Sequence, residues 1–143
     1  MEKVPSRADY RWFLPIPTRW MDNDVYGHVN NVIYYSYFDT VVNKMLIAEG
    51  LLDIEHSPTI GLCIESHCTF AASLAFPEVV EAALRIGKLG NSSVRYEIAL
   101  FREGNEAPAA TGYFVHVFVD RTTRRPVPLD EKARQKLSRL IAE

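Results

Sequence analysis

The chain has 143 residues, 48% of them apolar, which is enough for one globular domain with its own hydrophobic core. A formal net charge of −2 excludes the basic surface that general nucleic-acid binding requires. The N-terminus shows no signal-peptide pattern, and no run approaches the roughly 18 apolar residues of a membrane-spanning helix. Cys63 and Cys68 would face opposite sides of one regular strand and could not pair. We therefore expect a single cytoplasmic, reduced domain over residues 1–143.

The first predicted element is an edge strand within residues 10–21, because two prolines there cannot donate to a neighbouring strand. A helix follows, beginning at Asn30 or Asn31 and ending at Glu49. Its apolar residues recur at helical spacing around almost the whole circumference, which predicts a largely buried helix. Gly50 suits the position just after the last turn.

A long strand is predicted next, from Ile60 to Leu74, because apolar residues alternate there with a period of two. One face would be apolar and the other mixed. The predicted apolar face consists of Ile60, Leu62, Ile64, Ser66, Cys68, Phe70, Ala72 and Leu74.

Three further strands are predicted after it, over residues 80–86, 94–100 and 113–119. The first two form a hairpin around a turn at Gly90, which places Arg85 opposite Glu97 in a symmetric register. The third is almost continuously apolar, as expected at the centre of a sheet. A short amphipathic helix over residues 129–141 ends the chain.

This order of elements is typical of an α+β fold in which a five-stranded antiparallel sheet packs on one long helix. A single helix covers only one face of such a sheet. The other face and the sheet edges must therefore meet water or another copy of the chain. We expect a homo-oligomer with two-fold symmetry, either a homodimer or a homotetramer.

Candidate chemistry concentrates in residues 22–31, which read Asp-Asn-Asp-Val-Tyr-Gly-His-Val-Asn-Asn. The stretch runs directly into the predicted helix, where free N–H groups and the positive end of the dipole stabilise negative charge. The Asp24 carboxylate could attack a thioester carbonyl directly or activate a water molecule. Gly27 leaves room for a carbonyl to approach. This pattern suits hydrolysis of an activated acyl group.

The same stretch, followed by Tyr-x-x-Tyr-Phe, resembles the hotdog-fold acyl thioesterases, in particular the 4-hydroxybenzoyl-CoA thioesterase branch. The resemblance extends over nearly the whole chain and implies a sheet wrapped around a long central helix. It implies hydrolysis of an acyl-CoA thioester, with Asp24 as the catalytic carboxylate and the backbone N–H of Asn31 polarising the carbonyl. His28 would bind substrate or orient the loop. Coenzyme A belongs to the substrate, so no separate cofactor is expected. Val25 and Tyr26 replace the Pro-Ala of the hydroxybenzoyl enzymes, so the resemblance does not specify the acyl group.

The resemblance also implies basic or polar groups for the CoA phosphates near the turn between the third and fourth strands. Lys88, Asn91 and Ser92 occupy that turn. The arginines within residues 121–125 are an alternative source, although a solvated turn is the simpler interpretation.

Four other polar residues have simpler interpretations. Asp22 is interpreted as a structural residue that bonds loop amides. Glu65 and His67 would be either a second acid–base pair or an interface or solvated pair. His116, within an apolar strand, is interpreted as a hydrogen-bonded core histidine. Cysteine and histidine show no regular zinc spacing, so no metal site is expected.

Two other functions were weighed against the thioesterase. One is a hydratase or dehydratase of acyl thioesters, whose paired histidine and acid occur in motifs not found here. The other is a non-catalytic module that binds acyl-CoA. Asp24 discriminates between a thioesterase and such a binding module, because a binding module needs no anion aimed at the carbonyl.

Overall fold

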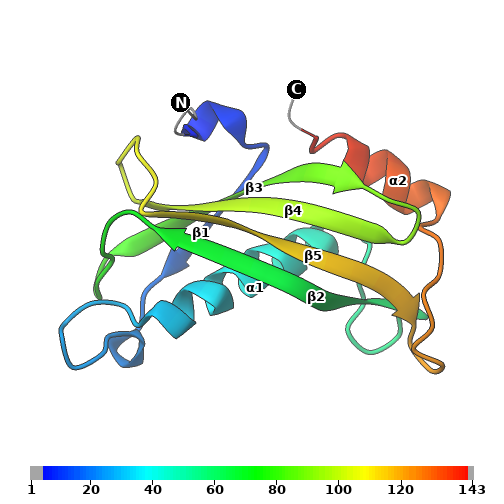
Figure 1. The fold of residues 1–143 in the computed structure, drawn as a ribbon, viewed down its shortest axis with the longest axis horizontal. Helices are drawn as coiled ribbons and strands as arrows, with labels where there is room; N and C mark the ends of the chain where they lie inside the picture. Colours follow the sequence, from blue (N-terminus) through cyan, green and yellow to red (C-terminus); the bar gives the residue numbers. More distant parts are fainter. Residues whose placement is uncertain (1–4, 142–143) are drawn as a thin grey trace.

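The computed structural model describes residues 5–141 and contains a five-stranded antiparallel sheet, one long helix and one short C-terminal helix (Figure 1). The sheet order is β1-β3-β4-β5-β2. The predicted architecture is therefore confirmed. The strands are β1 (Trp12–Pro17), β2 (Thr59–Phe70), β3 (Val79–Leu89), β4 (Ser93–Arg102) and β5 (Ala110–Asp120), and the helices are α1 (Asn31–Ala48) and α2 (Glu131–Ser138). Two 3₁₀ turns, η1 (Arg7–Asp9) and η2 (Trp20–Asp22), flank β1.

α1 runs along one face of the sheet and is buried where it meets the strands. Phe38 is fully buried and packs edge-on against Phe114 of β5, with ring centroids 5.8 Å apart. Gly112 of β5 permits this contact, since a Cβ atom there would lie 2.6 Å from the Phe38 ring and would collide with the backbone oxygen of His67. The helix and sheet therefore approach closely because one strand residue lacks a side chain.

The hairpin of β3 and β4 has the predicted register. Arg85 lies opposite Glu97, and its Nε donates to a Glu97 carboxylate oxygen over 2.8 Å. β1 is an edge strand, as its prolines predict, but it is shorter than the expected range. Its residues after Pro17 leave the sheet and enter η2, which carries the chain toward α1.

The prediction of one apolar face along β2 is wrong, for two reasons. Ile64 is an extra residue in β2, because Cys63 pairs with His116 and Glu65 with the adjacent Val115. The alternation therefore reverses at this bulge. β2 also ends at Phe70 and forms a sheet edge, and Ile64 remains 64% exposed.

The same bulge also changes which face of β2 the cysteines occupy. Cys63 and Cys68 pair with residues four apart on β5, so they lie on the same face rather than on opposite faces. Both are free thiols, because they are separated along the strand.

The expectation that residues 113–119 form the central strand is also wrong. β4 occupies the middle of the sheet, and β5 lies between β4 and the edge strand β2. β4 carries the most continuous burial, because its inner residues meet α1. Ala99 and Phe101 of β4 form a second, smaller cluster with Tyr10 and Ala83.

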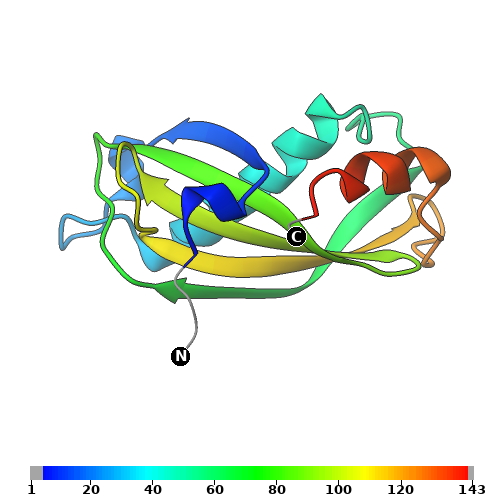
Figure 2. The same cartoon turned by 90° about the horizontal axis from the view of Figure 1, so that it is seen from above.

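The two ends of the sheet carry different parts of the chain. The segment between β1 and α1 lies at one end, and the β3–β4 turn, the segment after β5 and α2 lie at the other (Figures 1 and 2). Among the described residues, no helix has the length and apolar character needed to cross a membrane.

Candidate active site

Residues 23–29 form a tight loop at the entrance to α1. Asn23 and Val29 make an isolated antiparallel bridge, and inside it the Asp24 N–H donates to the His28 carbonyl over 2.9 Å. Gly27 adopts a φ of +85°, in the left-handed region that strains other residues. A glycine is thus required here by the backbone.

Asp22 fastens this loop to the helix. Its carboxylate is fully buried and accepts from the Tyr37 hydroxyl over 2.7 Å, from the Arg19 N–H over 2.9 Å, and from the Arg19 guanidinium. Burial by itself raises the pKa of Asp22, but these donors outweigh burial and hold the pKa below its usual range. The Asp22 carbonyl also accepts from the Asn30 N–H over 2.9 Å. Asp22 therefore has the structural position expected of it.

Asp24, in contrast, reaches the surface. One of its carboxylate oxygens accepts from the Tyr26 N–H over 2.9 Å, and within residues 5–141 the other has no hydrogen-bond partner. Asp24 lies between two clefts. The first cleft, of about 450 Å³, is lined by Asp24, His28, Val29, Asn30, Asn31, Tyr34, Phe70, Ala71, Ala72 and Ser73. The second cleft, of about 660 Å³, is lined by Trp20, Asn23, Asp24, Val25, Tyr26, Gly27 and Asn30.

The first turn of α1 opens into the first cleft. The Asn30 side chain caps the helix by accepting from the Val32 N–H over 3.0 Å, and the Asn30 carbonyl accepts from the Ile33 N–H. The Asn31 N–H has no acceptor among the described residues. Asn31, whose N–H has no acceptor, and Asp24, which keeps one carboxylate oxygen unpaired, therefore line the same cleft at the end of α1 where the helix dipole favours negative charge.

Aromatic side chains support the wall of the first cleft. Tyr34 packs edge-on against Phe70, with ring centroids 4.8 Å apart, and its hydroxyl accepts from the Leu74 N–H. Burial raises the pKa of Tyr34 above its usual value. The adjoining Ala71–Ser73 segment was missed by sequence reasoning, which treated it as the end of a strand. No local signal marks it, since it reaches the site only through the packing of β2 beside α1.

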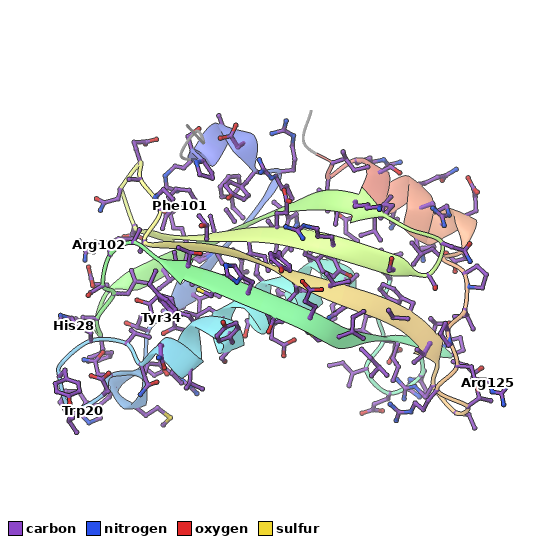
Figure 3. The ribbon with its side chains drawn as sticks, viewed as in Figure 1. Trp20, His28, Tyr34, Phe101, Arg102 and Arg125 are labelled. Atoms are coloured by element: carbon purple, nitrogen blue, oxygen red, sulfur yellow. The ribbon has the colours of Figure 1, made fainter. Side chains whose placement is uncertain are left out.

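The structure brings together Asp24, Gly27, His28 and Asn31, at the end of the sheet where Figure 3 labels His28, Tyr34 and Trp20. Gly27 lines only the second cleft. The His28 side chain is exposed at the rim of the first cleft, whereas its carbonyl holds the loop.

The residues expected to bind the CoA phosphates lie elsewhere. Lys88, Asn91 and Ser92 are at the β3–β4 turn, at the opposite end of the sheet from Asp24 in a single chain (Figure 1). Lys88 is exposed. The Asn91 carbonyl accepts from the Leu129 N–H, just before α2, and the Ser92 carbonyl accepts from the Phe118 N–H of β5. Arg125, the alternative, also lies at that far end (Figure 3).

Glu65 and His67 lie on the sheet face away from α1 and line neither cleft. Both contact Tyr113, whose hydroxyl donates to Glu65 over 2.5 Å and whose ring stacks on His67. Arg95 covers the same ring, with its guanidinium carbon 3.8 Å from the centroid. The hydrogen bond to Glu65 raises the pKa of Tyr113. These contacts form a polar ladder across strands rather than a pair facing Asp24.

His116 is a core histidine, but the expectation that it is hydrogen-bonded is wrong. Its ring lies between Tyr96 and Phe118, and its Nδ1 has no hydrogen-bond partner within residues 5–141. Burial lowers the pKa of His116 to about 4. Gly61 leaves space for the ring, since a Cβ atom there would lie 2.6 Å from Nδ1.

Across residues 5–141, no three histidine, cysteine, aspartate or glutamate side chains are grouped so that they could hold a metal ion.

Comparisons with known proteins agree with this geometry. Residues 18–137 match the model of the thioesterase-like superfamily. The structure is similar to that of the PA5185 protein from Pseudomonas aeruginosa, at 51% identity and a TM-score of 0.95, with 99% of each chain covered. The PA2801 protein from Pseudomonas aeruginosa, described as a candidate thioesterase, is 28% identical with a TM-score of 0.82, and the match covers 87% of this chain and 95% of that one.

A more distant structure shares the fold alone. The DHNA-CoA thioesterase from Staphylococcus aureus is 20% identical with a TM-score of 0.77, over 89% of this chain and 86% of that chain. No curated protein sequence matches the chain. The family match extends over most of the chain, and so the chain belongs to the thioesterase-like superfamily and has the hotdog fold.

Proposed function

We propose that this protein hydrolyses an acyl-CoA thioester to a carboxylic acid and free CoA. The observation that carries the proposal is the first cleft, which is lined by both Asp24, with one unpaired carboxylate oxygen, and Asn31, whose N–H lacks an acceptor among the described residues. The family assignment and the similarity to the PA2801 protein, which is described as a candidate thioesterase, support hydrolysis of a thioester.

In the proposed reaction the thioester carbonyl oxygen accepts a hydrogen bond from the Asn31 N–H. This amide is oriented before the reaction, so it stabilises the developing oxyanion without reorganisation. Asp24 then acts in one of two ways. Its open oxygen attacks the carbonyl carbon, the C–S bond breaks to release the thiolate, and water hydrolyses the mixed anhydride; or Asp24 takes a proton from a water molecule that attacks instead.

The proposal includes a two-fold dimer formed along β2. This edge strand has unpaired backbone groups and exposed apolar residues, including Ile64 and Phe70. Antiparallel pairing of β2 with its copy would place the catalytic end of one chain on the same side as the far end of its partner. Lys88, Asn91 and Ser92 would then serve the partner's site, where they are proposed to bind the CoA phosphates.

The test is release of free CoA from acetyl-, hexanoyl-, palmitoyl- and benzoyl-CoA. Cys63 is exposed and would react with a thiol reagent, so free CoA is measured by chromatography. We expect turnover by the wild type and a loss of about 10²-fold or more in Asp24→Asn. Glu106→Gln, which alters an exposed carboxylate outside both clefts, is the matched control.

Two results would contradict the proposal. Equal turnover by Asp24→Asn would remove the assigned role of the carboxylate. Tight binding of acyl-CoA without any release of CoA would identify a binding module instead.

A further inference from the structure

The most exposed large apolar side chains of the described chain gather beside Asp24. Val25, Tyr26 and Trp20 are 94%, 83% and 80% exposed, and Met21 adjoins them. Exposed apolar residues are unremarkable singly, but a group of them at the rim of a cleft indicates a binding surface. Hydrolysis at Asp24 does not by itself require these side chains.

Trp20 and Tyr26 line the second cleft, which has Asp24 and Asn30 in common with the first. A thioester extends in two directions from its carbonyl, one along the acyl group and one along the thiol. A carbonyl held at Asp24 therefore has one arm directed along each cleft. The second cleft is continuous with the reacting position and large enough for a ring system.

Both aromatic residues are held relative to Asp24. Trp20 lies in the same 3₁₀ turn as the buried Asp22, and its ring packs edge-on against Phe76 at 5.9 Å. Tyr26 is joined to Asp24 through its backbone N–H, so its Cα keeps a defined place in the loop. The walls of the second cleft are thus built into the same anchored segment as the proposed catalytic group.

The charge of the second cleft restricts its occupant. Among residues 5–141, no lysine, arginine or histidine lines it, and Asp24 is its one acidic residue. A phosphate group would be repelled there. A flat, uncharged ring would instead bury apolar surface on Trp20 and Tyr26, because stacking on an aromatic side chain requires only that the ligand have a planar ring face.

We infer that the cleft between Trp20 and Tyr26 binds a planar aromatic ring of the substrate, either the adenine of the CoA arm or an aromatic acyl group. This inference rests on the proposed function, because the substrate is the thioester hydrolysed at Asp24. Either source supplies the same chemistry, a ring face without charge.

The experiment crosses two acyl groups with two thiol arms. Hexanoyl and benzoyl thioesters of CoA and of N-acetylcysteamine, which lacks adenine, give four substrates. kcat/KM is measured for the wild type, Trp20→Ala and Tyr26→Ala. Ile54→Ala is the matched control, because Ile54 is a similarly exposed apolar residue that lines neither cleft.

We expect both variants to lose about tenfold more kcat/KM on the substrates that carry the bound ring than on the ringless hexanoyl-N-acetylcysteamine. Loss on both CoA thioesters identifies adenine, and loss on both benzoyl thioesters identifies the acyl group. An equal loss on all four substrates, or no loss on any, overturns the inference. So does a change of oligomeric state in Trp20→Ala by sedimentation, since a second copy would then be the occupant.

A binding measurement separates this inference from the proposed function. Adenosine and benzamide, both uncharged, are titrated against the wild type, and quenching of Trp20 fluorescence is followed, with Trp20→Ala defining the contribution of Trp12. Saturable quenching that weakens in Tyr26→Ala supports the ring site even if no thioester is hydrolysed. Turnover of the ringless thioester without any quenching supports hydrolysis and overturns the ring site.

Discussion

The two ends of α1 differ in how their unpaired backbone groups are bonded. Every helix leaves N–H groups unpaired at its N-terminus, the positive end of its dipole, and carbonyl groups unpaired at its C-terminus, the negative end. At the C-terminal end the carbonyls of Glu49 and Gly50 accept from Lys136 and Lys132 of α2, over 2.5 and 3.1 Å. At the N-terminal end the Asn31 N–H has no acceptor among the described residues, and Asn31 lines a cleft. The carbonyls at one end are thus bonded by α2, whereas at the other end the proposed function assigns the Asn31 N–H to the substrate.

The largest expected effect on stability is the difference between replacing Asp22 and replacing Asp24 at the N-terminal end of α1. Asp22→Ala leaves the buried Tyr37 hydroxyl and the Arg19 N–H without their acceptor, and should cost about 3 kcal/mol. Asp24→Ala removes one exposed hydrogen bond and should cost less than about 1 kcal/mol. Urea unfolding of both variants measures the difference. Equal losses would mean that Asp24 supports the fold as much as Asp22 does.

A pH-dependent effect of similar size is expected from His116, which the mechanism does not use. Burial lowers its folded pKa to about 4, whereas the unfolded chain binds the proton near 6.5. The unfolded state therefore holds more protons between these values, and stability falls as the pH is lowered from about 6.5 to 4, by up to about 3 kcal/mol. His116→Phe should flatten this part of the curve. Unfolding measured at pH 4.5, 5.5 and 7 checks it, and parallel curves for the two proteins would refute it.

The smallest expected effect is at the C-terminal end of α1. Lys132→Met and Lys136→Met each remove a cation from the last carbonyls, which should cost about 0.5–1 kcal/mol of stability. Neither residue lines the clefts that contain Asp24, so kcat/KM should stay within twofold of the wild type. A loss of activity comparable to that of Asp24→Asn would show that the two ends are not independent.

Periodicity in the sequence was sufficient for α1, for the β3–β4 hairpin and for the pairing of Arg85 with Glu97. These features depend on residues close together in the chain. The reversal at Ile64 was not predictable, because a bulge is an extra residue opposite a partner strand, and alternation alone does not reveal the partner. The place of β4 at the sheet centre depends likewise on the strand order.

The candidate site likewise combines residues that are close in the sequence with contacts between distant segments. Asp24, Gly27 and Asn31 could be proposed as candidates because one short stretch carries them. The Ala71–Ser73 wall and the contact of Trp20 with Phe76 arise from packing between distant segments, so no local pattern announces them. His116 was misinterpreted because an apolar strand pattern shows burial but not whether a ring nitrogen finds a partner.

The most direct test of the open amide is a comparison of Asn31→Pro with Asn31→Ala. Proline is tolerated at the first helical position, and Asn30 already has φ −62° and ψ 140°, the conformation that a following proline favours. Asn31→Pro therefore deletes the N–H while keeping the helix, whereas Asn31→Ala removes only the side chain. We predict a loss of about 10²–10³-fold in kcat for Asn31→Pro, near-normal turnover for Asn31→Ala, and unchanged stability in both. Equal kcat values for the two variants would contradict the account.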